Sequence, residues 1–170
     1  MRRAVVILCM DIGLAALLMP LAVPHRAQIV YNPSDSVPRG WYRIGPADAL
    51  QVGNIVLARL PAPATALAAQ RGYLPAGVPL LKRVGAMAPQ RVCIDGMSVR
   101  IDDVVVVAVM RADGHGRPLS DWSQCRHLVR GELFLLSNTN PASFDSRYFG
   151  PIRASDVIGS AQPLWTWSAP

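Results

Sequence analysis

The sequence has little lysine and few charges for its length of 170 residues. Of 17 basic residues, 16 are arginine and one is lysine, Lys82. Only 16% of the residues are charged and 51% are hydrophobic, so the composition favours one ordinary packed domain over a disordered chain. The net charge is +6, but no basic run with interleaved aromatic residues is present. This disfavours a nucleic-acid partner, and a basic surface lies more readily against anionic lipid.

The common enzyme motifs are also missing. There is no G-x-S-x-G elbow, Walker loop, G-x-G-x-x-G or H-E-x-x-H motif. The histidines, His25, His115 and His127, have no serine-protease context, which disfavours a Ser-His-Asp triad. No His or third Cys stands at metal-ligand spacing near Cys93 or Cys125. We therefore expect no metal and no cofactor.

A long apolar run is present at the N-terminus. Arg2 and Arg3 precede AVVILCMDIGLAALLMPLAV, which carries a single charge, Asp11. Such a run, as a helix, spans roughly 30 Å, the thickness of the hydrocarbon core of a membrane. We predict a single transmembrane anchor at residues 1–24, with a cytoplasmic N-terminus and residues 25–170 across the membrane. A cleaved signal peptide is the alternative, although the run is long for one.

Two cysteines fall in the exported part under this interpretation. Cys93 and Cys125 are an even pair, and such a pair forms a disulfide naturally in an oxidising compartment. Closing a loop of about 30 residues would stabilise the fold by roughly 3 to 4 kcal/mol in the chain-entropy model. We therefore predict a Cys93–Cys125 disulfide.

After residue 24 the pattern is mainly that of β-strands. Short β-branched or aromatic runs such as QIVYN, GWYRIG, GNIVLARL, RVCIDG and ELFLLS are separated by Gly, Pro, Asn and Asp. Asp95-Gly96 predicts a tight hairpin. Only residues 64–74 have the pattern of a helix, and residues 111–124 are typical of a polar loop. The predicted fold class is a compact, mostly β domain with one short helix.

Lys82 is a candidate general base. Arginine cannot give up its proton in a protein, whereas a lysine amine can when it is desolvated. The apolar residues of VPLLK would lower the pKa of this amine by burial. A neutral amine can take a proton from a serine hydroxyl, which permits Ser-Lys catalysis without histidine. A surface lysine left beside Arg83 by chance is an equal alternative from composition alone.

The segment NPSDSVPRG offers a serine nucleophile for that base. Pro33 and Pro38 restrict the backbone, and Gly40 allows another chain to approach closely. Ser36 is the candidate nucleophile, with its own amide as one oxyanion donor. Ser34 lies on the same side in an extended segment and can donate through its hydroxyl. An ordinary turn is the competing interpretation.

Three ordered segments of the chain resemble the type I signal peptidases. NPSDSVP is similar to their nucleophile box P-S-x-S-M-x-P, and KRVGAMAPQRV is similar to their lysine box K-R-x-x-G-x-P-G-D-x-V. SNTNPASFDSRYFGPI is similar to G-D-N-x-x-x-S-x-D-S-R-x-x-G-x-V, with Ser-Asn-Thr in place of Gly-Asp-Asn. The short chain, PRGWYRI and the W-x-x-C-x-x-L-x-x-G-E pattern resemble the conjugative transfer (TraF) type. This implies the signal-peptidase/LexA-like β fold on a single N-terminal transmembrane helix, in the bacterial inner membrane, with a periplasmic catalytic domain.

The resemblance also implies a role for each residue of these boxes. Ser36 would be the nucleophile and Lys82 the general base. The Ser34 hydroxyl and the Ser36 amide would form the oxyanion hole. Ser143 would orient the Lys82 amine by a hydrogen bond.

Two further residues would support that site. Asp145 and Arg147 would form an ion pair, and in the TraF type Asp145 bears more directly on activity. The implied substrate is a propilin or another exported precursor bound as an extended strand, and other conjugation or secretion components are further candidate partners. Attack on the acyl-enzyme by water would hydrolyse the substrate, whereas attack by the substrate's own N-terminal amine would cyclise it.

Three alternatives stay open at this point. The first is a general signal peptidase for exported preproteins. The second, a self-cleaving regulator of the LexA type, would need a DNA-binding helix-turn-helix where this chain has its apolar run. The third is a non-catalytic periplasmic β module, for which Lys82 would be solvated, far from Ser36 and ordinary in its pKa.

Overall fold

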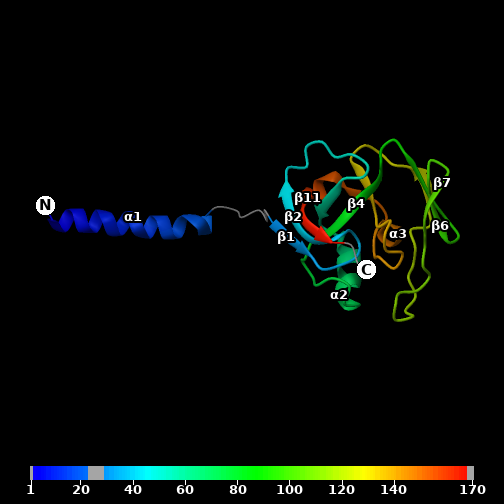
Figure 1. Ribbon diagram of the computed structural model, residues 1–170, viewed down its shortest axis with the longest axis horizontal. Helices are drawn as coiled ribbons and strands as arrows, with labels where there is room; N and C mark the ends of the chain where they lie inside the picture. The colour runs from blue at the N-terminus through cyan, green and yellow to red at the C-terminus, as the bar shows by residue number, and fades with distance from the viewer. Residues whose placement is uncertain (1, 23–28, 168–170) are drawn as a thin grey trace.

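The computed structural model describes residues 2–22 and 29–167. The predicted junction between residues 24 and 25 therefore lies outside the described residues. Helix α1 (Arg2–Ala22) lies outside the β body of the molecule, as Figure 1 shows. Within the described ranges, no helix is both long enough and apolar enough to cross a membrane.

The body of the molecule is built on two antiparallel sheets. The larger sheet has seven strands, in the order β1 (Ile29–Asn32), β2 (Arg39–Gly45), β11 (Val157–Trp167), β3 (Ile55–Ala58), β4 (Leu80–Met87), β9 (Glu132–Leu136) and β10 (Ile152–Arg153). The smaller sheet has the order β7 (Val104–Ala108), β6 (Ser98–Ile101), β5 (Arg91–Asp95) and β8 (Cys125–His127). Strands β6 and β7 lie at the end of the body away from α1 (Figure 1). The predicted mostly β class is confirmed.

Two tight hairpins shape the smaller sheet. Asp95 pairs with Ser98, and Gly96 between them has a φ of 62°, which confirms the predicted hairpin. The run SVRIDDVVVVAV forms two strands, because Asp102 and Asp103 have φ values of 49° and 67° and turn the chain. Aspartate tolerates this left-handed conformation better than most residues.

The helices differ from the prediction in number and in bounds. The helix predicted at residues 64–74 is α2 (Ala62–Gln70), which begins just after Pro61 and stops before Gly72, at a φ of 72°. A second short helix, α3 (Ser146–Phe149), and a 3₁₀ turn, Ala154–Asp156, are also present. The prediction of one short helix was therefore wrong. A four-residue helix is too short to produce a 3.6-residue pattern in the sequence.

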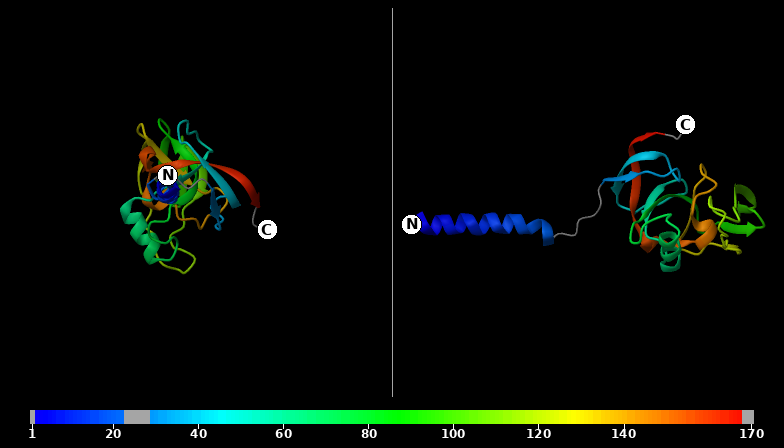
Figure 2. Two further views of the ribbon diagram at one scale, coloured as in Figure 1. Left: turned by 90° about the vertical axis from the view of Figure 1, so that its left-hand side faces the viewer. Right: turned by 90° about the horizontal axis from the view of Figure 1, so that it is seen from below.

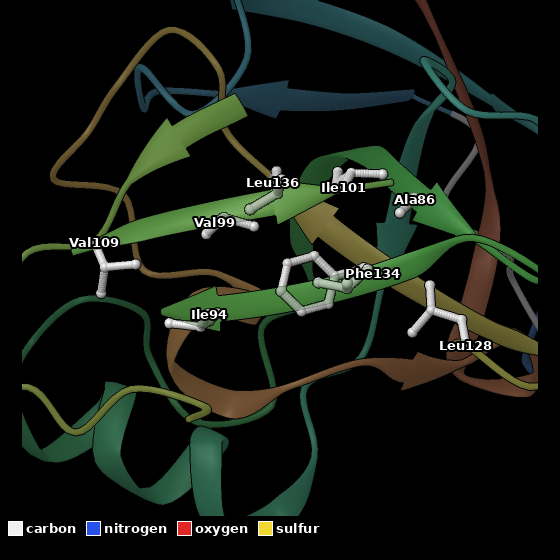
Figure 3. Packing of buried hydrophobic residues seen from close by; sticks show 9 residues of the cluster. Ala86, Ile94, Val99, Ile101, Val109, Leu128, Phe134 and Leu136 are labelled. Atoms are coloured by element: carbon white, nitrogen blue, oxygen red, sulfur yellow. The ribbon is translucent and has the colours of Figure 1, made fainter. Parts of the chain in front are cut away.

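The two sheets share a hydrophobic core. Figure 3 shows Phe134 of β9 among side chains of the smaller sheet, including Ile94 and Val99, and all three are buried. The predicted pair Cys93 and Cys125 is joined as a disulfide between the paired strands β5 and β8. These contacts fix the smaller sheet against β4 and β9 of the larger one.

The close approach at Gly40 is made by strand β11 of the same chain and not by another chain. A Cβ at Gly40 would lie 2.1 Å from the carbonyl oxygen of Trp165, and the φ of Gly40 is 139°. Any other residue at this position would clash with backbone and be strained. Figure 2 shows β11 running beside β2 at the edge of the body. Strand β2, which follows the Ser36 loop directly, is therefore held against β11.

Candidate active site

Residues from all three sequence boxes line one cavity of about 620 Å³. Ser34 and Ser36 come from the loop between β1 and β2, Lys82 from β4, and Ser143 from the segment before α3. The remaining wall is largely apolar and includes Leu60, Leu74, Val78, Leu80, Leu119 and Phe144. The fold thus brings to one cavity four side chains that lie up to 109 positions apart in the sequence.

The Ser36 loop is folded around a buried side chain, that of Asn32. Its Nδ2 donates to the carbonyl oxygens of Ser34, Val37 and Pro38 at 2.8, 3.0 and 3.2 Å. Its Oδ1 accepts from the amide and the hydroxyl of Ser34 at 3.2 and 2.9 Å. The Oγ atoms of Ser34 and Ser36 are 2.7 Å apart, so the two serines do point the same way. Asn32 was not predicted as a site residue. The only sequence signal at this position is the general preference of asparagine for turns.

The loop is also fastened from outside. Tyr42 donates its hydroxyl to the carbonyl of Pro38, and Thr139 donates its hydroxyl to the carbonyl of Asp35 at 3.1 Å. Arg39 pairs with the Asp35 carboxylate, and its hydrogen bond holds the pKa of Asp35 below the usual range. Thr139 stands in the Ser-Asn-Thr sequence that replaces Gly-Asp-Asn. That departure from the box therefore supplies a contact between the last box and the Ser36 loop.

Lys82 is buried in β4, with only 4% of its surface exposed. Burial is the main reason that its pKa falls from 10.5 to about 8, with Asp145 opposing this change and Arg147 adding to it. Its Nζ donates to Ser143 Oγ, which is the contact predicted for Ser143. Among the described residues, no hydrogen bond joins Lys82 Nζ to Ser36 Oγ. The two groups share the cavity, each bonded to a different serine.

Asp145 and Arg147 form the predicted ion pair, and both side chains are fully buried. The guanidinium donates to both carboxylate oxygens, at 2.7 and 2.9 Å. Arg147 also donates to the backbone carbonyls of Ala108, Pro141 and Ser143. Neither residue lines the cavity, so the pair does not contact its contents. It supports the cavity wall instead, because Arg147 holds the backbone that carries Ser143. A buried ion pair is favourable only when its remaining polar atoms are bonded in this way.

The polar loop at residues 111–124 forms the far wall of the cavity. Asp113 accepts a hydrogen bond from the hydroxyl of Tyr73 and pairs with Arg117 at 2.7 Å. Burial alone would raise the pKa of Asp113, but the hydrogen bonds from Tyr73 and Arg117 hold it well below its usual range. Tyr73 also contacts Phe144, with ring centroids 5.3 Å apart. Leu119 of this loop adds an apolar side chain to the wall.

Comparison with known proteins identifies the family of the chain. The family model described as signal peptidase, peptidase S26, matches residues 1–167. The chain belongs to the peptidase S26 family. This confirms the resemblance that the three boxes indicate, and membership of this family implies serine peptidase activity.

Individual relatives point to the conjugative branch of the family. A probable conjugal transfer protein TraF of Sinorhizobium fredii is 38% identical over 147 residues, which cover 81% of this chain and 77% of that protein. A plasmid transfer protein TraF of Escherichia coli is 30% identical over 165 residues, 92% of this chain and 93% of that one. A crystal structure of signal peptidase I from Enterococcus faecalis aligns with 66% of this chain and 97% of its own, at 19% identity and a TM-score of 0.41.

Proposed function

We propose that this peptidase uses Ser36 as its nucleophile and Lys82 as its general base. The observation that carries the proposal is that Lys82, the only lysine of the chain, is buried and lines the same cavity as Ser36. Its burial lowers the pKa of the amine to about 8. Burying a lysine amine is unfavourable, so a lysine that has no catalytic or binding role is normally exposed to solvent. A non-catalytic β module would leave Lys82 solvated and ordinary in its pKa, which is the opposite of this arrangement.

The proposed reaction begins when a substrate carbonyl enters beside Ser36. The Ser36 hydroxyl turns from Ser34 toward Lys82, whose neutral amine takes the proton as Oγ bonds to the carbonyl carbon. Hydrogen bonds of this kind are often absent before substrate binds. The Ser36 amide and the Ser34 hydroxyl then donate to the oxyanion, a contribution that is typically worth about 10²–10³ in rate for one donor.

The second half of the reaction returns the proton. Protonated Lys82 gives it to the leaving amine, the peptide bond breaks, and the acyl group remains on Ser36. Water then attacks the acyl-enzyme and releases a free acid, or the N-terminal amine of the substrate attacks and closes a ring. Ser143 keeps the amine oriented through both steps.

For the substrate, we propose the precursor of a conjugative or type IV secretion pilin. The support is the similarity to TraF proteins across most of the chain. A general signal peptidase acting on many exported preproteins is the alternative. The apolar cavity wall suits a substrate segment of small or apolar side chains in either case.

We also propose that the chain sits in the bacterial inner membrane with its catalytic domain in the periplasm. The support is the run of apolar residues after Arg2 and Arg3, whose described side chains, from Val5 to Leu14, are exposed on α1. An oxidising periplasm would also preserve the disulfide. Protease treatment of spheroplasts tests this, since only a periplasmic domain is digested while the inner membrane is intact.

Co-expression with the cognate propilin tests the peptidase proposal. Intact-mass spectrometry of the propilin would compare wild type with Ser36→Ala, Lys82→Arg and the control Ser123→Ala, an exposed serine outside the cavity. We expect mature product from wild type and the control only. Normal maturation by Ser36→Ala or Lys82→Arg would contradict the dyad. A cyclic product would be one water lighter than the hydrolysed peptide.

A further inference from the structure

The hydrogen bonds around Asn32 determine which way its amide faces. Nδ2 lies against three carbonyl oxygens, and Oδ1 lies against the N–H and the hydroxyl of Ser34. Exchanging the two atoms would set an oxygen against three acceptors and an NH₂ group against a backbone donor. The amide therefore has a single orientation. Asn32 is 5% exposed and lines the cavity.

This orientation fixes the direction of the hydrogen bond between the two serines. A hydroxyl has a single proton, and that of Ser34 is donated to Asn32 Oδ1 at 2.9 Å. The proton in the 2.7 Å contact between Ser34 and Ser36 must then come from Ser36. The resting chain is Ser36 to Ser34 to Asn32, and it directs the nucleophile's proton away from Lys82. In this state Ser34 offers a lone pair to its neighbour and has no proton for an oxyanion.

We propose that Asn32 is a positioning residue that holds the Ser36 loop and keeps the Ser34 proton until substrate binds. The role rests on the proposed function, because it assigns Ser36 as nucleophile and Ser34 as oxyanion donor. When a substrate carbonyl arrives, the Ser34 proton turns from Asn32 to the carbonyl oxygen, and the Ser36 proton turns to Lys82. Asn32 Oδ1 keeps the N–H of Ser34, at 3.2 Å, so this exchange leaves no buried acceptor unpaired.

A double-mutant cycle on propilin cleavage tests this role. The full-length enzyme would be measured as wild type, Asn32→Ala, Ser34→Ala and the double variant. Asn54→Ala is the matched control, because Asn54 also binds a backbone N–H in a turn but lies outside the cavity. We expect Ser34→Ala to lose about 10²–10³-fold in kcat, the value of one oxyanion donor, and Asn32→Ala to lose about tenfold to a hundredfold. KM of both should stay within about threefold of wild type.

The double variant decides whether Asn32 acts through Ser34. We expect its loss in kcat to be at least about fivefold smaller than the product of the two single losses. Losses that multiply, or an Asn32→Ala enzyme as active as Asn54→Ala, would overturn the role of Asn32. Cleavage by Ser36→Ala or Lys82→Arg in the same series would instead overturn the proposed function, so the two failures are distinguishable.

Asn32→Asp provides a second test that holds even if Asn32→Ala does not fold. Its ionised carboxylate would face the carbonyls of Val37 and Pro38 and hold the Ser34 proton more tightly, whereas the protonated acid can still donate to a carbonyl. We therefore expect kcat of Asn32→Asp to stop rising with pH once the new carboxyl ionises, because loss of the acid form offsets the gain from neutral Lys82. Wild type should rise over the same range as Lys82 loses its proton. A variant profile that rises in parallel with wild type would contradict the proposal.

Discussion

Replacing Lys82 by methionine should inactivate the peptidase and stabilise its fold. Methionine has a similar length and no charge, so it fills the buried position in β4 without an amine to desolvate. The pKa difference between 10.5 and about 8 corresponds to about 3 kcal/mol, at roughly 1.4 kcal/mol for each pKa unit. Loss of the bond to Ser143 leaves that hydroxyl without its partner, at a cost of about 1 kcal/mol. The variant should therefore be about 2 kcal/mol more stable at pH 7.

The sign of this effect has a characteristic dependence on pH. The Lys82 pKa is lower in the folded protein than in the unfolded chain, so below pH 8 both states are protonated and the folded state carries the full penalty. Between pH 8 and 10.5 only the folded state loses the proton, and wild type gains stability relative to the variant. The advantage of Lys82→Met should be largest near pH 7 and close to zero near pH 9.5.

Urea unfolding at pH 7 and at pH 9.5 measures both values. Arg100→Met is a matched control, since it removes an exposed cation from β6, and its effect should stay within about 0.5 kcal/mol at both pH values. If Lys82→Met is less stable than wild type at pH 7, burial of the charged amine does not destabilise the fold. If the difference in free energy of unfolding is the same at both pH values, the pKa of Lys82 is not lowered in the folded protein.

Three other properties of the protein can be predicted. Cleavage by wild type should increase with pH and level off above about pH 8, where Lys82 is neutral; a rate that is flat from pH 6 to 9 would oppose the assignment. Arg147→Met should lower the free energy of unfolding by about 3–5 kcal/mol in urea, because its carboxylate partner stays buried and unpaired, whereas Arg39→Met in an exposed pair should change it by at most about 1 kcal/mol. The Cys93→Ala/Cys125→Ala protein should lose about 3 to 4 kcal/mol by the chain-entropy estimate, and an unchanged thermal midpoint would show that the disulfide contributes nothing.

The sequence predicts the site better than it predicts the sheet around it. The single lysine and its apolar neighbours make burial of Lys82 one of two equal alternatives, the resemblance to the lysine box favours it, and the structure shows Lys82 buried. Strand β4 was not predicted, because LLKRVGAM has two adjacent positive charges, Lys82 and Arg83, in the middle of an otherwise apolar segment. Strand β11 was not predicted for a different reason, because a proline such as Pro163 is unfavourable inside a regular strand. The strand accommodates Pro163 by a shift in register between Pro163 and Trp165.

Other features depend on contacts that no local pattern contains. Asn32 has the sequence preference of any turn asparagine, and its role arises only when the loop closes around its side chain. The polar segment at residues 111–124 becomes a wall of the cavity through Tyr73, which lies 40 positions from Asp113. Long-range contacts of this kind depend on the whole fold. The shape of the cavity could therefore not be predicted from the sequence, although Ser34, Ser36, Lys82 and Ser143 of its lining were predicted as site residues.

Because Lys82 is the only lysine, its pKa can be measured directly. Protein made with lysine carrying ¹³C at its ε-carbon should give one side-chain signal in a carbon–proton NMR spectrum, and titration of that signal reports the amine alone. We expect a midpoint near 8 in the folded protein, returning toward 10.5 in urea. A midpoint near 10.5 in the folded state would show that Lys82 is an ordinary solvated amine and would contradict its role as the general base.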